Sequence, residues 1–300
     1  MVKPLPATEP PRFSCLYVFG DSFADTGNAF QLTQGILANH PNRQHRFAND
    51  LIWIDYLADF LWLTFQCSSL PMRRGDGVNY AVGGATTGTV NLFPALMPVL
   101  PELPGLQQQI QAFAASFKRK KRADADALYI LSVGMTDYIP LVNGTPYQAD
   151  PKQSIHHLSD AIATLIKVGA KHILLSNLPD LGKTPIADAA HSKTPISTVA
   201  TAIATHNQAL VDLVQSFQPK ANVMLLDVKS LIDDAIAHPA QLGLRNVTLP
   251  CSQIEGCNPN DYLFWDQMHF TSQVHQQIAK SALVSICEAA IPSLAPVMGG

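Results

Sequence analysis

Hydrophobic residues along the chain occur in two alternating kinds of segment. Short segments that are mainly apolar, and as long as strands, lie at residues 15–19, 77–82, 127–133, 172–178 and 222–228. Longer segments carry apolar residues at the spacing of helix turns, and they lie at residues 50–62, 106–117, 154–169, 196–217 and 230–238. Continuously apolar strands separated by amphipathic helices are typical of a parallel sheet covered on both faces. The pattern therefore predicts an α/β protein, a three-layer α/β/α sandwich with a central, mostly parallel sheet.

One segment interrupts the alternation. Residues 93–106, "FPALMPVLPELPGL", contain four prolines among apolar residues. Because proline breaks both helices and central strands, we expect this segment to run over the surface.

Length and composition favour one domain. The chain has 300 residues, of which 47% are hydrophobic and 14% are charged, so it can bury a large core. No tract has the composition of a linker. We expect a single domain over residues 1–300, with residues 1–13 forming an irregular, proline-containing extension.

Charge and hydropathy exclude some partners. The net charge is −3, which gives no reason to expect nucleic acid binding, and the basic run Lys118–Arg122 is interpreted as a solvated helix end. No apolar stretch is long enough to span a bilayer, and prolines interrupt the N-terminal residues where a signal peptide would be apolar. We expect either a cytosolic protein or one whose signal has been removed, and the oligomeric state is left open.

The five cysteines are unevenly placed. Cys251 and Cys257 enclose a short loop and can form a local disulfide, whereas Cys15, Cys67 and Cys287 are isolated.

Candidate chemistry begins in the stretch "VFGDSFADTGN". Ligands of open α/β sheets bind outside the carboxyl ends of the strands, and Ser22 lies just beyond the predicted strand 15–19. A serine at this position is either a helix cap or a nucleophile, and a nucleophile needs a histidine and an acid to activate it. Near the C-terminus, "YLFWDQMHFT" places Asp266 and His269 three residues apart, so that the carboxylate can reach the imidazole. These three residues are the predicted catalytic triad.

Three motifs in this order resemble the SGNH hydrolases, also called GDSL esterases and lipases. "FGDSFADTGN" is similar to the first block of that family, "NYAVGGATT" to the second and "FWDQMHFT" to the last. The resemblance implies a flavodoxin-like SGNH hydrolase fold, with Ser22 as the nucleophile. It also implies an oxyanion hole that includes the N–H groups of Ser22 and Gly84, with Gly83 as the alternative register.

The third block departs from the family pattern. Where the family has Gly-x-Asn-Asp, this chain reads "GMTD", so that Thr136 stands in place of an asparagine whose amide completes the oxyanion hole. A threonine hydroxyl can donate a hydrogen bond, but its reach is shorter. We expect Thr136 to be the third donor, with Asn143 as a possible substitute from a loop.

Four other residues are expected to support the site without contacting substrate, namely Asp21, Asp25, Gly83 and Asp137. The histidines at 156, 157 and 206 lack metal-ligand spacing, so no metal site is predicted. No phosphate-binding or dinucleotide-binding glycine pattern follows a strand, and we expect no cofactor. Asp180 is interpreted as a loop cap.

The resemblance implies a serine carboxylic-ester hydrolase that forms an acyl-serine on lipid-like or small esters. The same intermediate would serve an acyltransferase, and a non-catalytic binding protein on this fold is the third alternative. Residues 93–106 can line an acyl pocket, which favours lipid-like or aryl esters. Members of the family are commonly secreted or periplasmic, which would require a signal that this chain does not show.

Overall fold

The central sheet has six parallel strands. A computed structural model describes residues 10–38, 45–71, 76–117, 122–143, 149–187 and 194–290. The strands are β1 (Leu16–Gly20), β2 (Phe65–Cys67), β3 (Gly77–Asn79), β4 (Leu128–Ser132), β5 (His172–Ser176) and β6 (Asn222–Leu226). They are arranged in the order β2-β3-β1-β4-β5-β6 and every pair is parallel.

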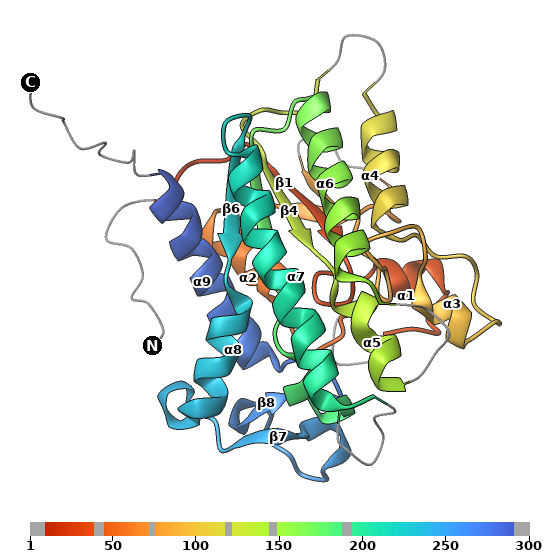
Figure 1. Cartoon of the computed structure of the whole chain (residues 1–300), viewed down its shortest axis with the longest axis vertical. Helices are drawn as coiled ribbons and strands as arrows, with labels where there is room; N and C mark the ends of the chain where they lie inside the picture. Colours follow the sequence, from red (N-terminus) through yellow and green to blue (C-terminus); the bar gives the residue numbers. More distant parts are fainter. Residues whose placement is uncertain are drawn as a thin grey trace, which may run out of the picture.

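Helices cover both faces of the sheet, as predicted. One face packs against α4 (Leu106–Ala115), α6 (Pro151–Val168) and α7 (Ile196–Phe217), which lie in front of the strands in Figure 1. The other face packs against α2 (Trp53–Phe60), α8 (Val228–Ala237) and α9 (Ser272–Ala290). Alternate residues of β1 enter opposite cores: Leu16 and Val18 pack with α2 and α9, whereas Phe19 packs with α4. Burial on both faces explains why the strands are continuously apolar, and the three-layer α/β/α prediction is confirmed.

The strand order creates a crevice beyond β1. The chain passes from β1 to β2 and β3 on one side and then crosses to β4 on the other side. Connections that leave a strand in opposite directions separate at its carboxyl end and open a binding crevice there. Ser22 follows β1 directly, so the topology places this serine at the crevice.

Short elements surround the carboxyl ends of the strands. They are the helices α1 (Asn28–Leu32), α3 (Leu92–Leu96) and α5 (Met135–Asn143), and the two-stranded parallel sheet of β7 (Asn246–Pro250) and β8 (Tyr262–Phe264). Single 3₁₀ turns occur at Leu181–Lys183, Pro185–Ala187, Pro239–Leu242, Cys251–Gln253 and Pro259–Asp261. Cys251 and Cys257 form a disulfide in the connection between β7 and β8, and the other three cysteines are free and buried.

Several boundaries differ from the predictions. The predicted strand 77–82 ends at Asn79, although Tyr80 and Val82 still donate hydrogen bonds to β1 carbonyls. The edge strand β2 and the strands β7 and β8 were not predicted. Strands β2 and β8 have three residues each, too few for a period to be recognised, and four of the five residues of β7 are not buried, so β7 is not continuously apolar.

The proline-containing segment 93–106 is only partly a surface excursion. It includes most of α3, and its residues Leu100 and Leu103 are buried.

Some predictions fall on uncertain parts of the chain. Residues 118–121 of the basic run and residues 1–9 of the N-terminal extension lie outside the described residues, and residues 10–15 contain no helix or strand. Within the described part of the chain, no helix is both long and apolar enough to cross a membrane.

Candidate active site

The nucleophile candidate lies in a tight turn after β1. The N–H groups of Ala24 and Asp25 both donate to the Asp21 carbonyl at 3.0 Å, which closes one helical turn around Ser22. Gly20 allows β1 to enter this turn, because a Cβ at Gly20 would lie 2.0 Å from the Ser132 carbonyl oxygen of β4. The turn is supported from outside by Trp53 of α2, whose indole N–H donates to the Phe23 carbonyl at 3.0 Å.

The three predicted triad residues lie within hydrogen-bond distance of one another. Ser22 Oγ is 2.8 Å from His269 Nε2, and His269 Nδ1 is 2.8 Å from Asp266 Oδ2. The serine and the histidine are buried, and 247 positions of sequence separate them. The fold therefore brings together the three side chains that the sequence predicts. Their geometry is that of a nucleophile, a base and an orienting acid.

The acid and the base share one short loop. Asp266 accepts backbone N–H groups from Met268 and His269 at 2.9 and 2.7 Å, and the same carboxylate reaches His269 Nδ1. The N–H of Trp265 donates to the His269 carbonyl at 2.8 Å and closes the loop. Ser252, next to the disulfide, donates its N–H to the Trp265 carbonyl at 2.8 Å. These contacts fix the orientation of the His269 imidazole relative to Asp266, three residues earlier in the same loop.

The charge state of Asp266 suits this role. Burial alone would raise the pKa of the carboxyl, but the His269 ring and the N–H donors outweigh burial and lower the pKa below its ordinary value. The ionised carboxylate can accept a hydrogen bond from a protonated Nδ1. In that tautomer Nε2 carries no hydrogen and can accept the hydrogen bond of the Ser22 hydroxyl.

Two backbone N–H groups are available to an oxyanion. Gly83 N–H donates to Asp25 Oδ2 at 2.8 Å and is therefore engaged. Across the part of the chain that the structure describes, no protein acceptor is hydrogen bonded to the N–H of Ser22 or Gly84. Gly84 has φ +79°, and a Cβ there would lie 2.6 Å from Asn91 Oδ1 and 2.7 Å from the Phe93 ring, so this position requires glycine. The geometry favours Gly84 over Gly83 as the donor.

The third predicted donor has an alternative acceptor. Thr136 is buried near the start of α5, and its hydroxyl is 3.5 Å from Asp21 Oδ2, which is a long hydrogen bond. Asn143 was expected in a loop, but it is the last residue of α5. Seven residues of helix separate its backbone from Thr136 by about 10 Å, which favours Thr136 for the role.

Three buried carboxylates link the segments that carry the predicted oxyanion donors. Asp25, after β1, holds the glycine turn after β3 through Gly83 N–H. Asp21, also after β1, accepts Gly134 N–H from the segment after β4 at 3.3 Å. Asp137 completes the set, because it accepts the N–H and the hydroxyl of Thr87 at 2.9 and 2.6 Å. Each carboxylate connects two of the three strand ends.

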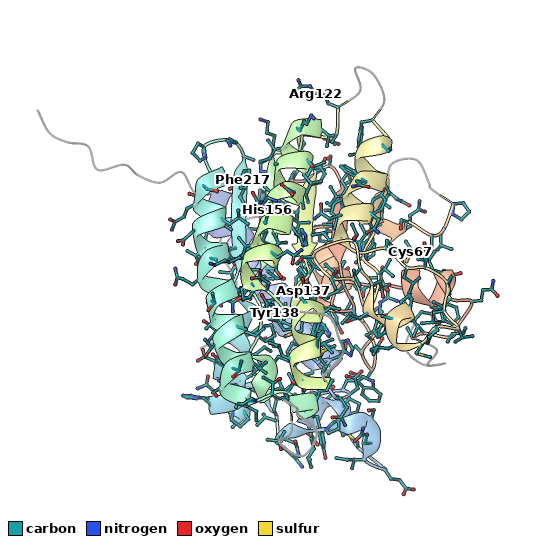
Figure 2. The ribbon with its side chains drawn as sticks, turned by 45° about the vertical axis from the view of Figure 1, so that its right-hand side comes forward. Cys67, Arg122, Asp137, Tyr138, His156 and Phe217 are labelled. Carbon is teal, nitrogen blue, oxygen red and sulfur yellow. A yellow bond between two sulfur atoms is a disulfide. The ribbon has the colours of Figure 1, made fainter. Side chains whose placement is uncertain are left out.

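Each of these carboxylates has further contacts. Asp25 also accepts the N–H groups of residues 27, 28 and 29, so it organises the start of α1. Asp137 accepts the Ser154 hydroxyl of α6 at 3.0 Å, and Figure 2 shows Asp137 beside Tyr138 where α5 begins. Burial raises the pKa of Asp21 to about 7, although the N–H groups of Phe23 and Gly134 oppose this shift.

The predicted helix histidines have different surroundings. His156 is exposed and lies 3.5 Å from Asp160, whereas His206 is buried and bonded through Nδ1 to the Tyr138 hydroxyl at 2.9 Å. His157 Nδ1 is 3.2 Å from the Thr87 hydroxyl. Among the described residues, no three or more His, Cys, Asp or Glu side chains are grouped to hold a metal ion. Asp180 caps the 3₁₀ turn that follows it by accepting Gly182 N–H at 2.9 Å.

Two aromatic rings lie beside the base, one from the first motif and one from outside the motifs. The ring centroids of Phe23 and Phe47 lie 5.2 and 5.3 Å from that of His269. Phe47 stacks on Phe93 of α3 at 5.8 Å. Phe47 is 222 positions from His269 and belongs to no motif, so nothing in the sequence pattern identifies it. The rings form an apolar wall beside the candidate nucleophile.

A parallel α/β/α sheet with a serine after its strand β1, hydrogen bonded to a histidine–aspartate pair from the loop after β8, is an arrangement typical of hydrolytic enzymes. Comparison with known proteins identifies the family. The chain belongs to the GDSL-like lipase/acylhydrolase family, whose sequence profile matches residues 16–282.

Its relatives have several named activities. A phosphatidylcholine-sterol acyltransferase from Aeromonas hydrophila is 27% identical, over 92% of this chain and 91% of that protein. A thermolabile hemolysin from Vibrio parahaemolyticus is 26% identical over 93% of this chain, which spans 65% of that protein.

Solved structures share the fold at low identity. An acetyl xylan esterase from Geobacillus stearothermophilus is 12% identical with a TM-score of 0.52, over 93% of this chain and 97% of that one. A member of the lipolytic G-D-S-L family from Veillonella parvula is 14% identical with a TM-score of 0.50, over 90% of this chain and 96% of that one.

Proposed function

We propose that this protein is a serine carboxylic-ester hydrolase that acts through an acyl-serine intermediate. The observation that supports the proposal most directly is the hydrogen-bonded series Ser22 Oγ, His269 and Asp266, with both links at 2.8 Å. In this mechanism His269 Nε2 takes the proton of Ser22 as Oγ adds to the ester carbonyl. Asp266 stabilises the resulting imidazolium.

The tetrahedral intermediate carries its negative charge on the former carbonyl oxygen. The N–H groups of Ser22 and Gly84, and the hydroxyl of Thr136, donate to this oxygen in the proposed hole. His269 then gives its proton to the leaving alcohol, and the acyl group remains on Ser22. Water deprotonated by His269 releases the acid and restores the serine.

The substrate class is proposed as lipid-like or small esters. The Phe23, Phe47 and Phe93 rings provide an apolar lining beside the histidine, which suits an acyl chain or an aryl group. Phe93 is the part of the proline-containing segment that contacts the Gly84 turn. The disulfide between Cys251 and Cys257 supports a location in an oxidising compartment.

A fluorophosphonate probe tests the nucleophile. We expect the wild-type protein to be labelled at Ser22 and to hydrolyse p-nitrophenyl butyrate. Ser22→Ala should prevent labelling and lower kcat by about 10⁴-fold or more, because it removes the covalent step. Ser216→Ala is the matched control, since Ser216 is exposed near the end of α7, which precedes β6 and therefore lies toward the amino ends of the strands, away from the triad. Near-normal turnover by a folded Ser22→Ala protein would contradict the proposal, and an unlabelled wild-type protein would support a binding protein instead.

Acyl transfer is the second candidate, because a relative that this chain matches over most of its length is named an acyltransferase. An alcohol acceptor would then replace water in attacking the acyl-serine. Phosphatidylcholine supplied together with cholesterol distinguishes the two outcomes: cholesteryl ester indicates transfer, and free fatty acid alone indicates hydrolysis.

A further inference from the structure

The surface next to the candidate active site is apolar over two neighbouring elements. Large hydrophobic side chains are exposed on α1, on α3 and on the residues that adjoin them. They are Leu32, Ile36, Val90, Leu96, Met97 and Val99. We call this the α1–α3 face. Val99 is 76% exposed, which is unusual for an aliphatic side chain that has a core available to it.

The two elements lie side by side and share one small core. Figure 1 shows α1 and α3 next to each other at the right-hand edge of the molecule. Between them is a separate cluster of buried residues: Ala29, Leu37, Val82, Leu100 and Leu103. Ala29 of α1 belongs to this cluster and Phe93 of α3 packs against it, whereas the exposed side chains remain outside. The exposed apolar residues therefore belong to one region of the surface.

The two segments of this region contain no charged residue, although the exposed Glu102 directly follows the second segment. Residues 27–38 and residues 83–101 contain no Asp, Glu, Lys, Arg or His, although 14% of the whole chain is Asp, Glu, Lys or Arg. At that frequency, about four charged residues would be expected in these 31 positions. A soluble protein partner is usually matched at its rim by charged or polar groups, whereas an uncharged, apolar surface suits an occupant that is itself apolar.

The α1–α3 face is continuous with the candidate active site. Phe93 lies in the first turn of α3, and its ring would contact a Cβ at Gly84 at 2.7 Å. Phe47 stacks on Phe93 and also lies beside His269. An apolar path therefore runs from the exposed side chains of α3, along two rings, to the catalytic histidine.

We propose that the α1–α3 face docks on the surface of a zwitterionic lipid aggregate, so that an ester chain passes along Phe93 and Phe47 to Ser22. The proposal rests on the ester hydrolase function proposed above. Docking would bury the exposed aliphatic side chains among acyl chains and headgroups, in the way that interfacial elements bind membranes. It would also place the carboxyl ends of the strands against the source of substrate.

The chain offers a matched control for this proposal. Trp62 is the most exposed large hydrophobic residue among those that the structure describes, at 92%. It follows α2 and precedes β2, so it lies at the amino ends of the parallel strands, opposite the candidate active site. Trp62→Asp removes as much exposed apolar surface as a change on the α1–α3 face, but at the wrong end of the molecule.

The test compares a soluble with an aggregated substrate. Leu96→Asp combined with Val99→Asp should leave hydrolysis of monomeric p-nitrophenyl acetate within twofold of wild type. The same double variant should lower hydrolysis of a long-chain p-nitrophenyl ester in phosphatidylcholine vesicles by tenfold or more. Trp62→Asp should leave both rates unchanged. Equal losses on both substrates, or none on vesicles, would overturn the proposal.

Binding is measured separately from catalysis with the Ser22→Ala protein. It should sediment with phosphatidylcholine vesicles, and 0.5 M NaCl should not weaken binding because the α1–α3 face has no charge. Adding the two aspartates should lower the bound fraction at least tenfold. Binding only to anionic vesicles, or a dimer that these aspartates dissociate, would overturn the proposal. Vesicle binding without hydrolysis of p-nitrophenyl acetate by the wild-type protein would refute the enzyme function and leave the docking face standing.

Discussion

The acid–base half and the oxyanion half of the candidate site are held in different ways. Asp266 and His269 are three residues apart, and nearly all of the contacts that orient them lie within one loop. The proposed oxyanion donors come from three strand ends: Ser22 after β1, Gly84 after β3 and Thr136 after β4. Their spacing depends on contacts between segments that are far apart in sequence.

The difference has a physical consequence. A loop that closes on itself keeps its geometry when distant parts of the protein shift slightly. The oxyanion half depends on the buried carboxylates Asp21, Asp25 and Asp137, each of which joins two segments. A buried carboxylate that loses its hydrogen-bond donors destabilises the fold. A substitution that removes one of these donors should therefore lower the stability of the protein as well as displace the oxyanion donors. We expect substitutions in the two halves to differ in how they affect catalysis and folding.

The largest loss is expected in the acid–base half. Asp266→Asn keeps the shape but removes the negative charge that holds His269 in the required tautomer, so kcat should fall by about 10⁴-fold. Asp180→Asn is the control, because Asp180 also caps a loop after a strand but lies outside the triad. The two variants are compared by steady-state hydrolysis of p-nitrophenyl butyrate. A kcat within tenfold of wild type for Asp266→Asn would remove the acid from the mechanism.

A smaller loss of kcat is expected when the N–H of Gly84 is displaced. Gly84→Ala forces a side chain against Asn91 and Phe93 and displaces the N–H, so kcat should fall by about 10² to 10³-fold with little change in KM. Gly243→Ala is the matched control, because Gly243 has φ +71° and no atom within 4 Å of its Cβ position. Both variants carry the strain of a positive φ, about 1 kcal/mol. If both lost kcat equally, the effect would come from strain and not from the oxyanion hole.

Substitutions at Thr136 test the side-chain donor of the oxyanion half. Thr136→Val keeps the shape and removes the hydroxyl, so it should lower kcat by roughly tenfold with little change in KM if the hydroxyl serves the transition state. Thr136→Asn should keep or raise kcat. If Thr136→Val had the kcat of wild type and Asn143→Ala had a strongly lowered kcat, the third donor would be Asn143 and not Thr136.

Features of the structure that depend on residues close together in the sequence could be predicted, whereas contacts between distant segments could not. Periodicity predicts the layers, and motifs predict Ser22, Asp266 and His269, because each of these signals lies within a few consecutive residues. The sequence does not show that Asp137 binds Thr87, 50 positions away, or that Phe47 lies beside His269. Those contacts arise only when strand ends meet. The acid–base half was therefore easier to predict than the connections of the oxyanion half.

The smallest effect on catalysis, and the clearest contrast in stability, is expected from Asp21. Its folded-state pKa is raised to about 7 by burial, from an ordinary value of 3.8. Between these pH values the folded protein holds a proton that the unfolded chain has lost, so this group lowers stability as pH rises. Asp21→Asn should therefore gain stability relative to wild type from pH 4 to pH 7, by at most about 4 kcal/mol. Denaturant unfolding at several pH values measures this change.

Asp266 is expected to change the free energy of unfolding with pH in the opposite direction, in the same experiment. Its folded-state pKa is lowered, so its contribution to stability is present above the ordinary carboxyl pKa and is lost as pH falls below it. Asp266→Asn should consequently be more destabilised, relative to wild type, at pH 7 than at pH 3, whereas Asp21→Asn should improve over the rise to pH 7. Opposite slopes would show that the loop carboxylate is ionised by its partner and the Asp21 carboxyl is kept neutral by burial. A pH-independent difference for Asp21→Asn would instead mean that Asp21 is ionised in the folded protein. The N–H donors of Phe23 and Gly134 would then be what stabilises its charge.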